Sequence, residues 1–135
     1  MGMKLYKDIS VLEIEIRSFS NEGYKVKYDF AKNLISWRDN YMWNNNFMKS
    51  ITDRKREVID SKLPESGMLE WMEGYNAGDI AKYGRKTSIP GEWEINVTFV
   101  DGTRLKSGAV QNFPKKWDNL RIIIEETTEC TFRLQ

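Results

Sequence analysis

Two stretches of strict alternation most constrain what this chain can fold into. Residues 12–17 read LEIEIR, and residues 93–99 read WEINVTF. Successive side chains of a β-strand point to opposite faces, so each stretch has one apolar face and one polar face. This pattern is typical of an antiparallel sheet that packs one face on a core and leaves the other in water.

Further strands follow from the same pattern. Residues 24–30 alternate in the same way, and a third strand begins at Leu34. The loop between them ends in Asn33, a residue type that tolerates the left-handed conformation. Asp101 and Gly102 predict a two-residue type I′ turn after the 93–99 strand.

Helices are expected in the middle of the chain and near its end. Thr52 is a suitable N-cap for a helix that Pro64 ends, and Ser66 is a suitable cap for a second one. Pro114 fits the first turn of a C-terminal helix. Apolar residues at helical spacing follow it and predict a face that covers a sheet: Trp117, Leu120, Ile123 and Ile124.

These elements predict an α+β fold. We expect an antiparallel sheet of about five or six strands with a C-terminal helix packed on one face and a central helical insertion. A length of 135 residues suits a single domain spanning residues 1–135. Its parts are N-terminal strands over about 9–38, the insertion over about 50–75, and a C-terminal hairpin plus helix over about 92–127.

The composition limits which catalytic and metal-binding chemistries are available to the chain. The chain contains no histidine and one cysteine, and its formal net charge is +1. Without histidine, the chain lacks the commonest general base and the usual zinc ligand. Its net charge is too small to produce a long-range electrostatic field that would attract it to nucleic acid. No calcium-loop or phosphate-loop pattern occurs either, so we expect no catalytic residue, metal or cofactor. The carboxylate pairs Glu13/Glu15, Glu70/Glu73 and Glu125/Glu126 are interpreted as solvated surface.

The sequence also bears on location. Glu13 and Glu15 interrupt the only apolar run near the start, so a signal peptide is not expected, and no window approaches the ~18 apolar residues of a membrane span. Cys130 cannot form an internal disulfide and is interpreted as a half-buried small apolar residue. A cytoplasmic protein fits these features, although a disulfide-free secreted protein would share them.

The C-terminal stretch resembles a recurring motif. Trp93, Ile95, Val97 and Phe99 precede Asp101-Gly102, and Ser107-Gly108, Phe113-Pro114, Trp117 and Leu120 follow. Over about residues 91–125 this is similar to a hairpin-plus-helix of small Firmicute-type bacterial domains, in which tyrosine is common where Phe113 stands. Each matching position has a structural explanation, so the resemblance implies a fold and no known activity.

Two apolar segments off the strand pattern are candidates for a partner surface. They are rich in Trp, Tyr and Met, residue types enriched at interfaces, and acidic residues surround the second. The candidate partner-binding residues are Tyr41, Trp43, Phe47, Trp71, Met72, Tyr75, Glu70, Glu73 and Asp79. The alternative interpretation is that the apolar ones pack on a face of the sheet.

The leading functional hypothesis is a non-enzymatic protein-binding module. It would act by steric blocking, as inhibitor, immunity or anti-defence (anti-CRISPR-like) proteins of bacteria and phages do. The alternative is a nucleotide or nucleic-acid binding accessory protein that uses Lys82, Tyr83, Arg85 and Lys86. The sequence leaves the partner and the oligomeric state open.

Overall fold

The structure is a computed structural model that describes residues 5–18, 23–39, 46–76, 84–86, 91–110 and 112–132. Its elements in chain order are η1 (Tyr6–Asp8), β1 (Ile9–Arg17), β2 (Gly23–Asp29), β3 (Leu34–Asp39), β4 (Phe47–Ser50), α1 (Asp53–Ser66), α2 (Met68–Asn76), β5 (Gly84–Lys86), β6 (Glu92–Phe99), β7 (Arg104–Val110), β8 (Asn112–Pro114) and α4 (Trp117–Thr128).

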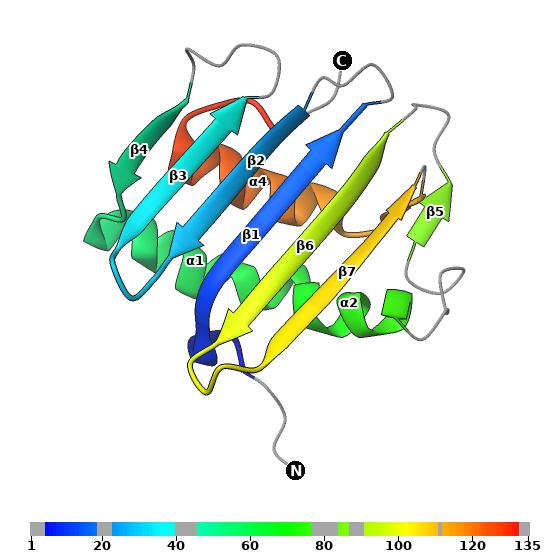
Figure 1. The fold of residues 1–135 in the computed structure, drawn as a ribbon, viewed down its shortest axis with the longest axis horizontal. Helices are drawn as coiled ribbons and strands as arrows, with labels where there is room; N and C mark the ends of the chain where they lie inside the picture. The colour runs from blue at the N-terminus through cyan, green and yellow to red at the C-terminus, as the bar shows by residue number, and fades with distance from the viewer. Residues whose placement is uncertain are drawn as a thin grey trace.

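The molecule has two layers. In the part of the chain that the structure describes, six strands form one antiparallel sheet in the order β4-β3-β2-β1-β6-β7, and β5 pairs with β8 separately. The helices α1, α2 and α4 all lie behind the sheet (Figure 1), on one of its faces. The α+β prediction, with its C-terminal and central helices, is confirmed.

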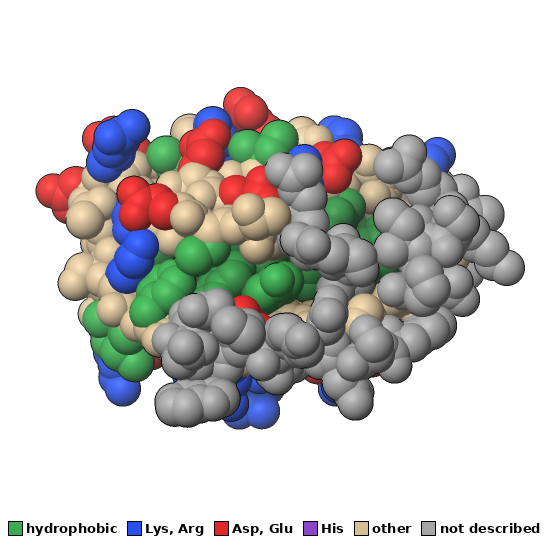
Figure 2. Space-filling view, turned by 90° about the horizontal axis from the view of Figure 1, so that it is seen from above, with side chains coloured by type: hydrophobic (Ala, Val, Ile, Leu, Met, Phe, Trp, Pro, Cys, Tyr) green, Lys and Arg blue, Asp and Glu red, His purple; other side chains and the backbone are tan. Residues whose placement is uncertain are grey.

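The alternation sets the register of the central strands. Ile14 of β1 lies opposite Val26 of β2 and Ile95 of β6, and all three side chains are fully buried. A slip of one residue would turn every apolar side chain of a strand toward water, so this register is strongly specified. Figure 2, which is seen from above the view of Figure 1, shows hydrophobic side chains gathered near the middle of that side of the molecule, with charged side chains around them.

The turn after β6 differs from the prediction. The Phe99 N–H donates to the Thr103 carbonyl and the Gly102 N–H to the Phe99 carbonyl, which leaves a three-residue loop. Gly102 has a positive φ of 88° while Asp101 does not, so a type I′ turn is wrong here. The Asp101 carboxylate accepts bonds from the Thr103 N–H and hydroxyl, and this fixes the loop. The other turn agrees with its prediction, since Asn33 has a φ of 54°.

Two prolines act differently from the prediction. Thr52 caps α1 as expected, since its hydroxyl accepts from the Lys55 N–H at 3.2 Å. Pro64 does not end this helix, which continues to Ser66 and ends at Gly67 with a φ of 69°. Pro114 ends β8, and α4 begins three residues later. Glycine with a left-handed backbone therefore provides the stop that we assigned to proline.

Short strands were missed because they lack an alternating pattern. The Asn-rich residues 39–50 indicate a loop or short irregular helix and the Gly-rich residues 76–91 a connection. The structure differs, since Phe47–Ser50 pairs with β3 and Gly84–Lys86 pairs with β8. The alternation of Cys130, Phe132 and Leu134 favours an edge strand at the tail, but residues 130–132 form no strand and Leu134 lies outside the described residues. Phe132 instead enters the core with its side chain fully buried, and Cys130 is half-buried against that core.

One buried hydrogen bond joins the sheet to α4. The Thr127 hydroxyl donates to the Ile123 carbonyl at 2.8 Å, so the Tyr28 hydroxyl donates to Thr127 Oγ1 at 2.6 Å. Tyr28 is fully buried in β2, and this burial raises the pKa of its phenol well above the ordinary value. The bond thus fixes α4 on the sheet as long as Tyr28 keeps its proton.

We expect Tyr28→Phe to lower the free energy of unfolding by about 1 kcal/mol, because Thr127 then keeps a buried oxygen that has lost its donor. Urea unfolding followed by circular dichroism measures the change. Tyr75→Phe is the matched control, because it removes a buried hydroxyl that has no hydrogen-bond partner among the described residues. An unchanged midpoint in Tyr28→Phe would show that the bond contributes nothing.

Alkaline pH should destabilise the protein through the same residue. The raised pKa means that the unfolded chain loses the Tyr28 proton first, so stability is complete below pH 10 and falls as pH rises above it. We expect the slope of stability against pH above 10 to be shallower in Tyr28→Phe. Equal slopes in both proteins would contradict this assignment.

Candidate protein-interaction surface

Six of the nine predicted partner-binding residues lie in the described part of the chain. Tyr41, Trp43 and Asp79 lie outside it, so the prediction for them is not tested. The six others belong to β4 and α2. They are Phe47, Glu70, Trp71, Met72, Glu73 and Tyr75.

The three apolar residues of α2 belong to the core. Trp71, Met72 and Tyr75 are 4%, 0% and 7% exposed, so these side chains cannot anchor a partner on this structure. Trp71 and Tyr75 pack edge-on against Trp93 of β6, with ring centroids 5.6 and 5.0 Å away. The Trp71 indole N–H donates to the Ser66 carbonyl. The surface interpretation of these three is wrong, and their packing on the sheet is the alternative that we left open.

The Tyr75 hydroxyl is an exception within this core. It is buried and makes no hydrogen bond with any residue that the structure describes. Desolvation raises its pKa to about 12. A buried hydroxyl without a partner loses its hydration and gains nothing in return.

Phe47 is partly buried and already has partners. Its ring stacks on Trp37 at a centroid distance of 5.9 Å and an interplanar angle of 5°. The Lys49 ammonium lies over the same ring, 4.8 Å from its centroid. Phe47 therefore covers the end of the core beside β3.

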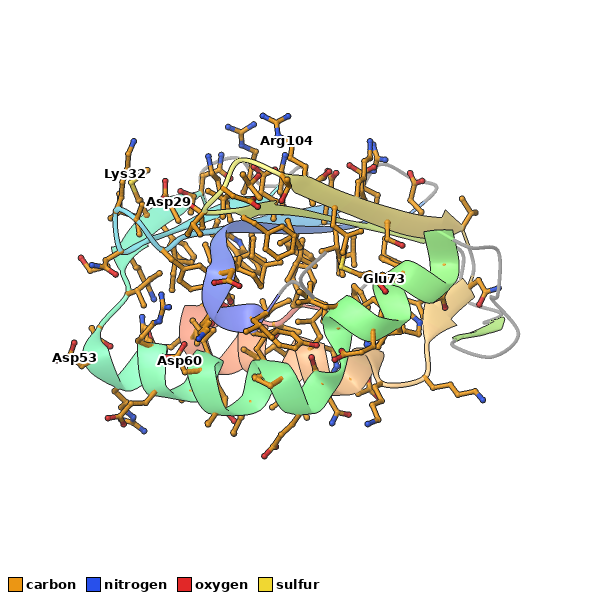
Figure 3. All side chains as sticks on the ribbon, turned by 90° about the horizontal axis from the view of Figure 1, so that it is seen from below. Asp29, Lys32, Asp53, Asp60, Glu73 and Arg104 are labelled. Atoms are coloured by element: carbon orange, nitrogen blue, oxygen red, sulfur yellow. The ribbon has the colours of Figure 1, made fainter. Side chains whose placement is uncertain are left out.

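The two acidic residues of α2 differ in whether they contact the rest of the fold. Glu70 accepts a hydrogen bond from the Tyr6 hydroxyl at 2.5 Å, which joins α2 to η1. Burial and this carboxylate raise the pKa of Tyr6, so the phenol stays protonated. Glu73 is exposed on α2 (Figure 3), and it remains available to solvent.

Only two of the four residues of the alternative phosphate-binding group lie in the described part of the chain. Lys82 and Tyr83 lie outside them. Arg85 and Lys86 belong to β5, where their backbones pair with Phe113 and Asn112 of β8. The hypothesis for this group stays a prediction.

No described helix covers the face of the sheet opposite α1, α2 and α4, here called the open face. Arg104 projects from this side, away from the helices (Figure 3). The alternation and register assign the following charged residues to it: Glu13, Glu15, Arg17, Lys25, Lys27, Asp29, Arg38, Glu92, Glu94, Arg104 and Lys106.

Most charges on the open face are sorted by strand into three bands, and the exceptions are Arg17 at the end of β1 and Asp29 at the end of β2. The central strands β1 and β6 carry the acidic band, which is Glu13, Glu15, Glu92 and Glu94. A basic band on β2 and β3 is Lys25, Lys27 and Arg38, and a second basic band on β7 is Arg104 and Lys106. Adjacent bands of opposite sign favour each other across the strands.

Two ion pairs join the acidic band to the basic bands, and a third forms between the acidic strands themselves. Lys25 lies 3.3 Å from Glu13 and Lys106 lies 3.8 Å from Glu94. Arg17, at the end of β1, lies 2.9 Å from Glu92. All are partly exposed, and such pairs contribute about 0–1 kcal/mol each, so the fold depends on them little.

Three cations of the open face, Lys27, Arg38 and Arg104, form no ion pair with any residue that the structure describes. Arg38 and Arg104 are both exposed, one on each side of the acidic band. Our sequence reasoning missed this surface because it treated the polar half of each alternation as solvated background. The signal was present in the order of the charges, and the strand order was needed to interpret it.

The remaining carboxylate pair, Glu125/Glu126, is engaged in contacts within the fold. Glu125 accepts from the Arg121 guanidinium at 2.6 Å and from the Phe132 N–H at 2.8 Å, so it fixes the end of the chain to α4. Its neighbour Glu126 pairs with Lys62 of α1. Within the described ranges, no three Asp, Glu or Cys side chains gather closely enough to hold a metal ion.

No family of known proteins, curated protein or solved structure matches the chain. The resemblance over residues 91–125 therefore stays a prediction. The described helices are all too short or too polar to cross a membrane.

Tyr75→Phe tests the assignment of α2 to the core. Removing a buried hydroxyl that lacks a partner should leave stability unchanged or raise it by up to about 1 kcal/mol. Urea denaturation measures this, with Tyr28→Phe as the matched change at a bonded hydroxyl. A loss of stability as large as that of Tyr28→Phe would mean that Tyr75 has a partner.

Proposed function

We propose that this protein is a non-enzymatic protein-binding module that contacts its partner through the open face. The observation that carries the proposal is the sorting of charges into an acidic band between two basic ones. A flat surface of this kind can fix the orientation and register of a partner with the complementary pattern, and it can speed their encounter.

The helix layer complements this role. Because α1, α2 and α4 supply the core on one side, the open face needs no apolar side chains to hold the fold. Its ion pairs are exposed and weak, and exchanging them for pairs with a partner costs little stability. The open face can therefore be shaped for recognition without a change in the core.

Steric blocking is the mode of action that we favour. A rigid sheet that lies flat on a partner covers its surface without any chemical step. The inhibitor, immunity or anti-defence role expected from the sequence belongs to this proposal.

A paired set of charge reversals tests the proposal. Arg38→Glu/Arg104→Glu inverts two exposed cations of the open face that form no ion pair among the described residues. Arg54→Glu/Lys115→Glu makes the same change in net charge at exposed residues of the helix side. Each variant and the wild type are immobilised and exposed to a nuclease-treated lysate of the organism that encodes the chain.

We expect a protein that the wild type and the helix-side variant retain equally and that the open-face variant retains roughly tenfold less. Binding should also weaken as salt is added, since exposed charges are screened. Equal retention by both variants would refute the open face as the contact surface. A partner that is retained from an untreated lysate but not from the nuclease-treated one would favour the nucleic-acid alternative.

A further inference from the structure

A pocket of about 220 Å³ lies on the helix side, away from the open face. It opens between η1, the turn after β2 and residues 56–64 of α1. Its lining is Tyr6, Lys7, Phe30, Arg56, Ile59, Asp60, Leu63 and Pro64. Two cations and two aromatic rings thus surround an apolar floor.

Arg56 is held in place at one wall. Its Nε donates to both carboxylate oxygens of Asp60, at 3.1 and 3.3 Å, and its Cζ lies 4.4 Å from the centroid of the Phe30 ring. Among the described residues, no hydrogen bond engages its two terminal nitrogens. A guanidinium that is already oriented loses little side-chain freedom when it binds an anion.

Lys7 supplies the second cation from η1. It forms no ion pair with any residue that the structure describes, and it lines the same pocket as Arg56. With Asp60 counted, the lining has one net positive charge, which suits a monoanion better than a dianion.

The floor of the pocket favours a ligand with an apolar part. Ile59 and Leu63 are buried, and Tyr6 and Phe30 flank them. Tyr6 is fixed because its hydroxyl donates to Glu70 and accepts from the Leu69 N–H at 3.0 Å. A cavity of about 150 Å³ is enough for benzene, so this pocket has room for one aromatic ring and a carboxylate.

We propose that this pocket binds a small aromatic carboxylate. The carboxylate takes the free donors of Arg56 and Lys7, and the ring lies on Ile59 and Leu63. The site is independent of the open face, so either can fail without the other.

Benzoate is the probe, with benzyl alcohol as the neutral equivalent and acetate as the equivalent without a ring. Amide NMR titrations of the full chain should show saturable shifts confined to residues 6–7, 30 and 56–64 with benzoate and much weaker ones with the other two. Arg56→Gln and Lys7→Gln should each weaken benzoate binding by roughly tenfold or more, because each removes a charge-assisted bond.

Arg54→Gln is the matched control, since it removes an exposed cation from the same helix outside the pocket. It should bind benzoate as the wild type does. Lys7→Gln removes no contact within the described residues, so its result stands even if Arg56→Gln fails to fold. The proposal is overturned if benzoate does not bind, if acetate or benzyl alcohol binds as well, or if Lys7→Gln matches Arg54→Gln.

Discussion

The structure depends on one constraint, which is that its sheet buries a single face. The register of β1 against β2 and β6 places Ile14, Val26 and Ile95 together under the helices, and a slip of one strand would expose its whole apolar set. Every helix must then lie on the same side (Figure 1). The open face and the pocket beside α1 both follow from this division, because one is what the helices leave bare and the other is a gap where α1 meets the sheet.

The helices are attached to the sheet through aromatic side chains. Trp93 of β6 is contacted by Trp71 and Tyr75 of α2 and by Trp117 of α4, so one residue of the sheet joins two helices. The Ser107 hydroxyl of β7 adds a hydrogen bond to the Met72 carbonyl. Large aromatic side chains bury much area at small entropic cost, which makes them useful both in interfaces and in small cores. Composition alone cannot distinguish these two uses.

The sequence predicted the long elements well because their signals are local. The signals that agree with the structure depend only on residues close together in the chain. They are the alternation in residues 12–17 and 93–99 and the N-cap at Thr52. The prediction was wrong where tertiary contacts decide: Phe47 lies in a strand because β3 is beside it, and Trp71 is buried because α2 packs on β6. The open face needed the strand order, since Glu13 and Glu94 are far apart in sequence but lie on adjacent strands.

The two proposed surfaces differ in what the fold requires of them. Ion pairs such as Arg17–Glu92 on the open face are exposed, so their residues can change at a cost of about 0–1 kcal/mol each. At the pocket, Ile59 and Leu63 also belong to the core, and removing either costs about 2–5 kcal/mol. The stability of the fold therefore requires the apolar side chains at the floor of the pocket. It does not require the Lys7 side chain at the rim. A cation kept at that rim serves ligand binding and not the fold.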